Sequence, residues 1–288
     1  MPELPEVEVV KKSLENKLKN LTIKRVFIIN NKLRYKINNN QFYRIKGKKI
    51  ISVKRRSKYL LINLNQNFTI LAHLGMTGKF FIIDKKNKKQ KTSFYYSIKN
   101  DESKHDHLCL HLNKGFKLIY NDVRKFGFLK LFKSKDIYKS NHLKDLGPEP
   151  LTKKFNINYV SKYTSNKNKT IKDLLMDQKF VSGVGNIYCN EILFSCKINP
   201  KRIARKVNKK ELANIVKFTK KILKMSIIQG GSSIKDFANT EGENGNFQQN
   251  FSVYSREDRK CNRKNCIGTI QKIYSSNRSS FFCSSCQK

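Results

Sequence analysis

The spacing of apolar side chains changes along the chain and predicts elements of different kinds. Near the start, apolar residues recur three and four positions apart, at Val7, Val10, Leu14 and Leu18. This spacing places them on one face of a helix and predicts a helix over residues 5–18. Pro5 suits the first turn of that helix, because the N–H that proline lacks would have no partner there.

Between Ile23 and Phe132 the chain alternates short apolar and polar runs, separated by basic or glycine-containing turns. Alternation with a period of two is typical of strands that bury one face. The clearest predicted strands are residues 59–64, 68–74, 108–112 and 116–120. We therefore expect an antiparallel sandwich or barrel, with a lysine-rich insert over residues 84–104.

Two prolines in the segment 146–150 mark a boundary, because proline fits neither a helix interior nor a central strand. Helical spacing then returns, and it predicts helices over 170–177, 186–196 and 209–228. Residues 239–250 are polar and glycine-rich and predict a loop. We expect an α+β chain with four parts: an N-terminal β-sandwich domain over 1–135, a hinge over 136–150, a helical domain over 151–250 and a cysteine-bearing module over 251–288.

The composition is strongly basic, with 61 Lys and Arg against 21 Asp and Glu and a net charge of +40. Such a charge favours a polyanionic partner, because each neutralised phosphate releases condensed counterions. An A/T-rich genome would also raise the lysine content, so the charge permits a nucleic-acid partner without establishing one. No apolar run is long enough to cross a membrane, and the first residues resemble no signal peptide. We expect a cytoplasmic protein without a membrane partner, whose cysteines are thiols or metal ligands.

Four cysteines near the end of the chain form two close pairs. Cys261 and Cys266 are followed after sixteen residues by Cys283 and Cys286. Two short-spaced pairs can supply the four thiolates of a tetrahedral zinc site, so we predict one structural zinc ion. The alternating segments 269–274 and 279–282 between the pairs predict a β-hairpin with Arg278 at its tip. Cys189 and Cys196 lie seven residues apart on one helical face and are predicted core residues.

The start of the chain offers an unusual nucleophile. Removal of Met1 would leave Pro2 with a free secondary amine, and an α-amine titrates near ~8 where a lysine titrates near ~10.4. Attack of this amine on an aldehyde-level carbon gives an iminium ion, which withdraws electrons strongly. Glu3 and Glu6 lie beside it and could transfer protons. On its own the motif is weak, because prolines near helix starts are common.

Four further motifs are scattered through the chain. A basic cluster ends at Lys58, and two glycine-containing turns carry Met76 and the pair Arg124 and Phe126. Asn186 stands at the start of a predicted helix, where backbone N–H groups can bind a phosphate. Each of these motifs alone is explained equally well as an ordinary turn or helix cap.

In this order, however, the motifs resemble bacterial formamidopyrimidine-DNA glycosylases of the Fpg/Nei family over essentially the whole chain. The resemblance implies a monomeric, nucleoid-associated enzyme that acts on double-stranded DNA containing oxidised bases or abasic sites. Such an enzyme excises oxidised purines, including 8-oxoguanine and formamidopyrimidines. It then cleaves the abasic strand by β/δ-elimination, as a bifunctional glycosylase and AP lyase. Structural zinc is the one cofactor implied.

The resemblance also implies roles for individual residues. Pro2 would attack C1′ and form a Schiff base, Glu3 would protonate the opening sugar, and Lys58 would hold the adjacent phosphate. A base inside a duplex must be flipped out to be reached. The residues implied to fill the gap are Met76, Arg124 and Phe126, with Arg124 donating to the orphaned cytosine.

The resemblance implies phosphate contacts for Asn186 and Arg278. It also counts Arg278 among the catalytic residues, together with Pro2, Glu3 and Lys58. Further DNA contacts are implied for His105 and, less directly, for Asn168 and Lys169. The loop 239–250, with Gly242 and Gly245, is similar to the loop that covers the lesion pocket in this family.

The chain departs from the family pattern in three places. The first cysteine pair has four intervening residues where two are common, Val123 replaces a usual proline, and Asn168 replaces a frequent lysine. The longer cysteine spacing affects the direction in which Arg278 points, and Val123 affects the rigidity of the Arg124 turn. The third change affects the DNA contact implied for Asn168.

Alternating His105, His107, Cys109 and His111 could also mimic a metal site, but the segment is similar to a strand of the family. Two other functions remain open. One is the sister activity of endonuclease VIII on oxidised pyrimidines. The other is a zinc-ribbon DNA-binding protein without catalysis, against which intact Pro2, Glu3 and Lys58 argue.

Overall fold

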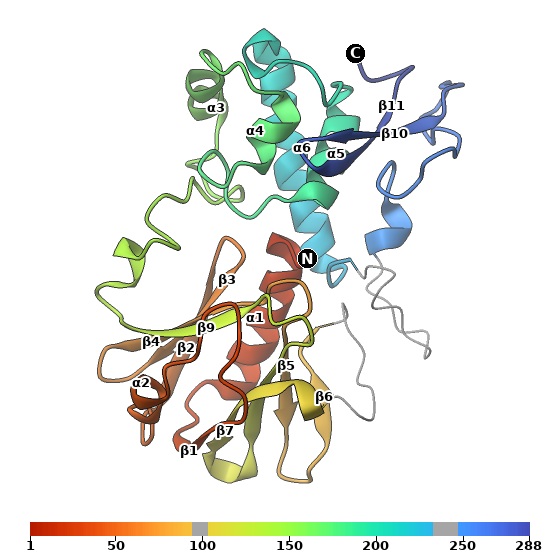
Figure 1. Ribbon diagram of the computed structural model, residues 1–288. Helices are drawn as coiled ribbons and strands as arrows, with labels where there is room; N and C mark the ends of the chain where they lie inside the picture. The colour runs from red at the N-terminus through yellow and green to blue at the C-terminus, as the bar shows by residue number, and fades with distance from the viewer. Residues whose placement is uncertain (94–102, 233–246) are drawn as a thin grey trace. The chain divides into compact units, whose positions relative to one another are not determined.

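The computed structural model describes residues 1–93, 103–232 and 247–288 (Figure 1). The chain forms two compact units: unit 1 comprises Met1–Lys144 and Gly230–Asn246, and unit 2 comprises Asp145–Gln229 and Phe247–Lys288. Gly242, Gly245 and most of the expected lesion-pocket loop lie outside the described residues, as do residues 94–102 of the expected insert.

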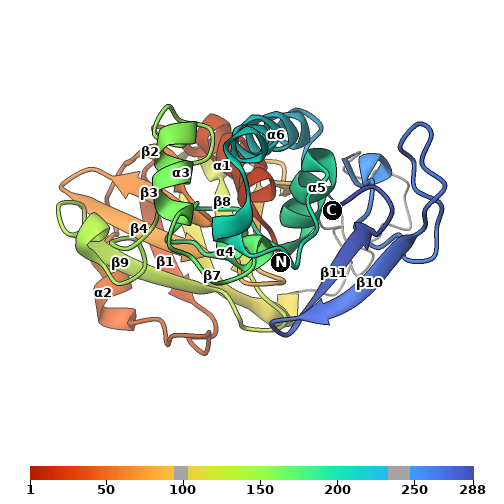
Figure 2. The same cartoon turned by 90° about the horizontal axis from the view of Figure 1, so that it is seen from above.

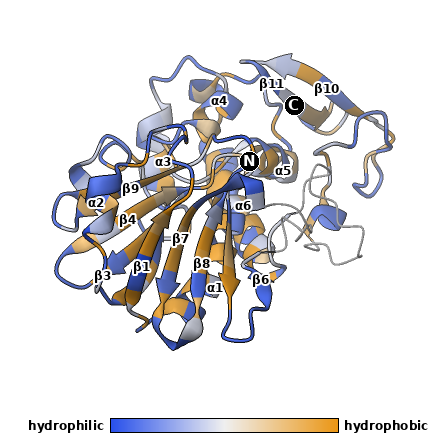
Figure 3. Ribbon diagram, turned by 60° about the horizontal axis from the view of Figure 1, so that its bottom comes forward, coloured by the Kyte–Doolittle hydropathy of each residue, from blue (hydrophilic) through white to orange (hydrophobic). Residues whose placement is uncertain are grey.

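Unit 1 is an antiparallel β-sandwich with a helix at its start, as the alternating pattern predicted. One sheet has the order β1-β7-β8-β5-β6 and the other has the order β2-β3-β4-β9. The first sheet contains β1 (Ile23–Ile28), β7 (Asp106–Leu112), β8 (Lys117–Asn121), β5 (Lys79–Ile83) and β6 (Lys89–Lys91). The second contains β2 (Ile50–Arg56), β3 (Tyr59–Leu64), β4 (Phe68–His73) and β9 (Phe128–Lys133). Figure 3 shows apolar and polar positions alternating along the strands of the first sheet.

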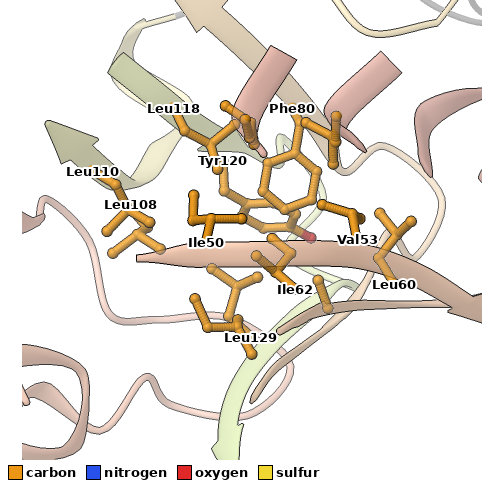
Figure 4. Packing of buried hydrophobic residues seen from close by; sticks show 14 of the residues in the cluster. Ile50, Val53, Leu60, Ile62, Phe80, Leu108, Leu110, Leu118, Tyr120 and Leu129 are labelled. Atoms are coloured by element: carbon orange, nitrogen blue, oxygen red, sulfur yellow. The ribbon is translucent and has the colours of Figure 1, made fainter. Parts of the chain in front are cut away.

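The core of unit 1 lies between the two sheets and against helix α1 (Leu4–Leu18). Figure 4 shows apolar side chains of the two sheets meeting around Tyr120 and Phe80, whose rings lie 5.0 Å apart edge to face. The buried Tyr120 hydroxyl donates to the carbonyl of His73 at 3.1 Å, so its polar end is satisfied. The predicted apolar stripe of the first helix is buried, which confirms that element: Val7, Val10, Leu14 and Leu18.

Unit 2 is built from four helices and a β-hairpin. The helices are α3 (Ile157–Thr164), α4 (Ile171–Met176), α5 (Asn186–Cys196) and α6 (Lys209–Ile228), and the hairpin is β10 (Ile270–Ser275) with β11 (Arg278–Cys283). The last three helices confirm the predicted ones. Helix α5 contacts α4, α6 and β11, and Figure 2 shows β10 and β11 paired along their length.

Two short helices have no counterpart among the predicted elements. They are α2 (Asn39–Tyr43) and α3, and each is capped by an asparagine. The side chains of Asn38 and Asn156 accept hydrogen bonds from the N–H groups of Gln41 and Tyr159. In helices this short, the caps contribute more to the helical conformation than any repeated apolar spacing. Within the described ranges, no helix is both long enough and apolar enough to cross a membrane.

Candidate functional site

The start of the chain is fixed by a reciprocal cap of helix α1. Pro2 is buried and directly precedes Glu3, the N-cap residue. The Glu3 N–H donates to the Glu6 carboxyl at 2.8 Å, and the Glu3 carbonyl accepts from the Val7 N–H. Both glutamates are almost fully buried, at 3% and 2% exposure. A capping box of this kind fixes the direction in which the preceding residue enters the helix.

Glu6 holds a second segment of unit 1 as well. Its Oε1 accepts from the N–H of Ser232 at 2.8 Å and from the Ser232 hydroxyl at 3.0 Å. Gly231 has φ +83° and lies so close that an added Cβ would come within 3.1 Å of Glu6 Oε1. Both carboxyl oxygens of Glu6 accept hydrogen bonds, so this residue holds the start of α1 against the segment Gly231–Ser232.

Lys58 lies in the two-residue turn between β2 and β3 and is 8% exposed. The turn is tied to α1 through Arg55. The Arg55 Nε donates to Glu8 Oε2 at 2.6 Å, and its Nη1 donates to the carbonyl of Ser57 at 2.9 Å. Charge-assisted bonds of this length are strong and directional. Arg55 therefore links the helix that begins after Pro2 with the turn that carries Lys58.

His73, at the end of β4, lies within the electrostatic reach of Lys58. Burial, together with the nearby charges of Lys58, Arg34 and His142, lowers its pKa to about 4. The imidazole is therefore neutral at pH 7. Its Nδ1 accepts from the Gly75 N–H at 3.1 Å, so Nε2 carries the proton and is a donor. The structure adds His73 and Arg55 to the predicted set around Lys58.

The turns that carry Met76 and Arg124 form one assembly. Gly75 has φ +59°, and an added Cβ would lie 2.4 Å from the backbone nitrogen of Gly127. The Thr77 hydroxyl donates to Asp122 Oδ1 at 2.5 Å and accepts from the Arg124 N–H at 3.0 Å. The other carboxyl oxygen of the fully buried Asp122 accepts from the Gly127 N–H at 2.7 Å.

These contacts leave two of the predicted gap-filling side chains, Arg124 and Phe126, on the surface. The Arg124 guanidinium lies 4.7 Å from the centre of the Phe126 ring, and Phe126 is 47% exposed. Met76 is partly buried in the neighbouring turn. Val123, which stands where a proline is usual in the family, is 42% exposed. The hydrogen bonds of Asp122 and Thr77 hold this turn without the rigidity that a proline would add.

His105 belongs to the same assembly, because its carbonyl accepts from the Asp122 N–H at 3.0 Å. The neighbouring His107 is fully buried, and its two ring nitrogens lie 2.9 Å from the Asn30 carbonyl and 3.0 Å from the Asp122 carbonyl. His107 therefore supports the backbone of the Arg124 turn. His111 lies against the ring of Phe27, with 4.6 Å between ring centres.

In unit 2, Asn186 is the first residue of α5, and its Nδ2 donates to the carbonyl of Ser279 at 3.0 Å. Gln178 organises the turns before α5: its Nε2 donates to the Val184 carbonyl, and its Oε1 accepts from the Gly183 N–H, both at 2.8 Å. Sequence reasoning missed Gln178, which lies just before the predicted motif.

Asn168 and Lys169 are both exposed. The Lys169 Nζ lies 2.9 Å from Asp177 Oδ2, and this hydrogen bond raises the pKa of the lysine. Lys169 is thus paired within the protein, while Asn168 faces solvent.

The predicted hairpin is present, but Arg278 directly follows its tip and does not form the tip itself. It is the first residue of β11 and pairs with Ser275 of β10. The turn itself consists of Ser276 and Asn277, with φ +50° and +58°. Two successive positive φ angles characterise the two-residue turn whose twist matches the flanking strands. The Arg278 side chain is exposed beside this turn.

The four predicted cysteine ligands converge, with all sulfur atoms within 4.8 Å of one another. Two sulfur pairs lie 3.9 and 3.6 Å apart, namely Cys261 with Cys286 and Cys266 with Cys283. A tetrahedral zinc site with Zn–S bonds of ~2.3 Å requires sulfur separations of about 3.8 Å. The cluster therefore fits a tetrahedral metal ion. The cysteines predicted to be core residues, Cys189 and Cys196, are indeed buried.

The four residues between Cys261 and Cys266 contain a side chain that contacts α5. Arg263 lies within the four intervening residues, and its Nη2 donates to the carbonyl of Phe194 at 2.7 Å. Its guanidinium also lies 4.7 Å from the centre of the Phe194 ring. Phe194 is near the C-terminal end of α5, and its carbonyl also accepts from the N–H of the C-cap residue Lys197 at 2.9 Å. The additional residues thus attach the cysteine module to α5.

Comparisons with known proteins agree with this arrangement. Residues 1–129 match the family model described as the formamidopyrimidine-DNA glycosylase N-terminal domain, and residues 146–238 match that of the formamidopyrimidine-DNA glycosylase H2TH domain. The chain is 40% identical to formamidopyrimidine-DNA glycosylase of Rickettsia bellii and 38% identical to that of Roseobacter denitrificans. Each match covers 100% of both chains.

Solved structures give the same result. The chain matches a mutant of Lactococcus lactis Fpg in complex with DNA containing Fapy-dG, at 30% identity and a TM-score of 0.85 over 100% of both chains. It matches the Lactococcus lactis Fpg complex with abasic-site DNA at 30% identity and a TM-score of 0.84 over 99% of both. From its sequence, its fold and its cysteine module, the chain belongs to the formamidopyrimidine-DNA glycosylase family, the Fpg branch of the Fpg/Nei DNA-repair glycosylases.

Proposed function

We propose that this chain excises oxidised purines from duplex DNA through a Schiff base at Pro2 and then cleaves the abasic strand. The observation that carries the proposal is the link between the start of α1 and the Lys58 turn through Glu8, Arg55 and Ser57. It ties the helix that follows the α-amine to the turn that bears a nearly buried lysine.

The chemistry follows from the groups present. The Pro2 nitrogen forms a bond to C1′ while the bond from C1′ to the base breaks, and the departing base takes up the proton that the Pro2 nitrogen loses. Glu3 gives a proton to the ring oxygen of the sugar, so the ring opens and the nitrogen lone pair forms the iminium. The iminium acidifies the C2′ hydrogen, whose loss expels the 3′ phosphate. Lys58 and the neutral His73 stabilise negative charge on phosphate beside this centre.

The remaining predicted residues recognise DNA. Met76, Arg124 and Phe126 replace the flipped nucleotide. The exposure of Arg124 and Phe126 supports this role, as does the hydrogen bonding that joins their turn to the turn of Met76. Asn186 and Arg278 bind phosphates in unit 2. Zinc held by the four cysteines stabilises the module that carries Arg278. The enzyme works as a monomer in the cytoplasm on nucleoid DNA.

Borohydride trapping tests the mechanism. With an 8-oxoguanine duplex, the iminium should be reduced to a stable cross-link, and peptide mass analysis should place it on Pro2. An undamaged duplex of the same sequence is the control, and the intact mass shows whether Met1 has been removed. A Lactococcus lactis Fpg structure contains an oxidised pyrimidine, so a duplex with such a lesion belongs in the series. A cross-link on a lysine, or none with a protein that excises the base, would refute the role of Pro2.

A further inference from the structure

Lys172, the second residue of α4, is buried in unit 2 at 2% exposure. Its Nζ donates to the carbonyl of Ser279 at 2.8 Å and to the hydroxyl of Ser280 at 2.6 Å. Lysines are rarely buried so completely, and here burial lowers the pKa of the amine. Both of these hydrogen bonds reach successive residues of a strand more than a hundred positions later in the chain.

Two side chains of α5 hold the same strand segment. The Asn186 Nδ2 donates to the Ser279 carbonyl at 3.0 Å, and the Asn190 Oδ1 accepts from the Phe281 N–H at 2.9 Å. With Lys172, they fix three consecutive residues, Ser279–Phe281, immediately after Arg278. The Ser279 carbonyl accepts from both Lys172 and Asn186, so its orientation is set from two sides.

We infer that Lys172 is a positioning residue that sets Arg278 and Asn186 for phosphate binding. The inference rests on the proposed function, since it assigns Lys172 an effect on that same DNA contact. Arg278 is exposed and adjoins the residue whose carbonyl is held, so the direction of its Cα–Cβ bond depends on that anchor. The Asn186 amide donates to the same Ser279 carbonyl, so its orientation depends on the anchor that Lys172 provides. Lys172 thus couples two phosphate-binding side chains through one acceptor, without touching DNA itself.

A double-mutant cycle tests this coupling. The variants are Lys172→Met, Arg278→Ala and the double variant, each loaded with zinc. The measurement is Kd for a duplex with a tetrahydrofuran abasic analogue at several salt concentrations. We expect Lys172→Met to weaken binding about tenfold in the wild type and by a smaller factor in the Arg278→Ala background, because coupled residues are not additive. Each single variant should lower the salt slope by about one phosphate contact, roughly 0.9, and the double variant by less than the sum of the two single variants.

Lys154→Met, at an exposed lysine of the same unit, is the matched control and should leave the salt slope unchanged. Zinc content and thermal melting identify a variant that has not folded. If Lys172→Met does not fold, Ser280→Ala removes one partner of the amine and should show a smaller effect with the same lack of additivity. Additive effects, or an unchanged salt slope in the folded variant, would overturn the inference.

A separate measurement tests the proposed function independently of the role of Lys172. Borohydride trapping of wild type and Lys172→Met at saturating enzyme reports the Schiff base alone. Failure of the wild type to trap defeats the proposed function. Trapping by both proteins together with additive affinities defeats only the role of Lys172.

Discussion

Replacing Thr77 by valine should loosen the turn that presents Arg124 while keeping the shape of the side chain. The Thr77 hydroxyl makes two hydrogen bonds, one to the buried Asp122 carboxyl at 2.5 Å and one from the Arg124 N–H at 3.0 Å. Valine fills the same volume and makes neither bond. Asp122 Oδ1 then loses this partner in a fully buried residue.

The size of the effect follows from these two bonds. A buried hydrogen bond contributes about 1 kcal/mol, and a buried acceptor that loses its partner costs about 1–3 kcal/mol. Thr77→Val should therefore lower the free energy of unfolding by about 2–4 kcal/mol. Melting temperature should fall by roughly 2–4 °C for each kcal/mol. The Arg124 backbone is also released, so the preference for cytosine over adenine opposite the lesion should fall by up to about tenfold.

Thr69→Val separates the local effect from general destabilisation. Thr69 is fully buried in β4, and its hydroxyl contacts Asn63 Oδ1 at 3.0 Å and Ser134 Oγ at 2.8 Å. It loses a comparable pair of bonds in the other sheet. The assay is single-turnover excision of 8-oxoguanine from duplexes that differ only in the opposite base. Thr69→Val should melt lower and keep the wild-type ratio.

The reasoning fails if both variants melt lower by a similar amount and both keep the ratio. Arg124 would then be held by contacts other than the Thr77 hydroxyl. It also fails if Thr77→Val melts like the wild type, because the two hydrogen bonds of the Thr77 hydroxyl would then contribute nothing measurable.

Three other changes probe separate parts of the chain. Arg124→Ala should lower the ratio of kcat/KM opposite cytosine to kcat/KM opposite adenine by roughly ten- to a hundredfold, and should weaken binding to an abasic site much less. Equal slowing opposite both bases would mean that Arg124 fills the gap left by the flipped base without distinguishing the opposite base. Cys283→Ser should reduce zinc from about one equivalent to none by metal analysis and should impair DNA binding more than the folding of unit 1; a zinc-free protein with full binding would contradict this. Arg202→Met removes bonds of 2.6 and 2.8 Å to Glu211, which lower the pKa of that carboxyl from 4.5. The stability that this pair contributes, about 0.5–1 kcal/mol for a partly exposed pair, is present above that pH and lost below it. The difference in the free energy of urea unfolding between wild type and Arg202→Met should therefore narrow as the pH falls below 4.5, to the part contributed by the Arg202 bonds to the carbonyls of Lys206 and Lys288. A difference that stays constant with pH would show that the ion pair contributes nothing measurable.

Features that depend on neighbours in sequence were predictable, and those that depend on distant contacts were not. The helices over 170–177, 186–196 and 209–228 follow from apolar spacing, and the cysteine cluster follows from two short-spaced pairs. The hairpin turn was predicted in the correct segment, but its tip was placed at Arg278 and lies at Ser276 and Asn277, which adopt positive φ angles without the glycine that normally marks such a turn.

Contacts across long stretches of chain explain the rest. Nothing in the sequence around Lys169 indicates that it pairs with Asp177. In the sequence, Arg55 is indistinguishable from the other residues of the basic cluster. Its role appears only when Glu8, 47 positions earlier, lies 2.6 Å from it. His73 opens a predicted motif, yet its neutrality depends on burial and on the charges of Lys58 and Arg34, which lie in a turn and a loop elsewhere in the chain.

The attachment of β11 to the helices has a consequence for the order in which the protein is made. Lys172 and Asn190 emerge from the ribosome well before the strand residues that satisfy them, 107 positions later for Lys172 and 91 for Asn190. At a synthesis rate of about 5–20 residues per second, that gap lasts roughly 5–20 seconds. During this interval a lysine and an asparagine destined for the interior must remain hydrated, so α4 and α5 cannot close fully over them. The helical unit should therefore complete its packing only after the last strand has been translated.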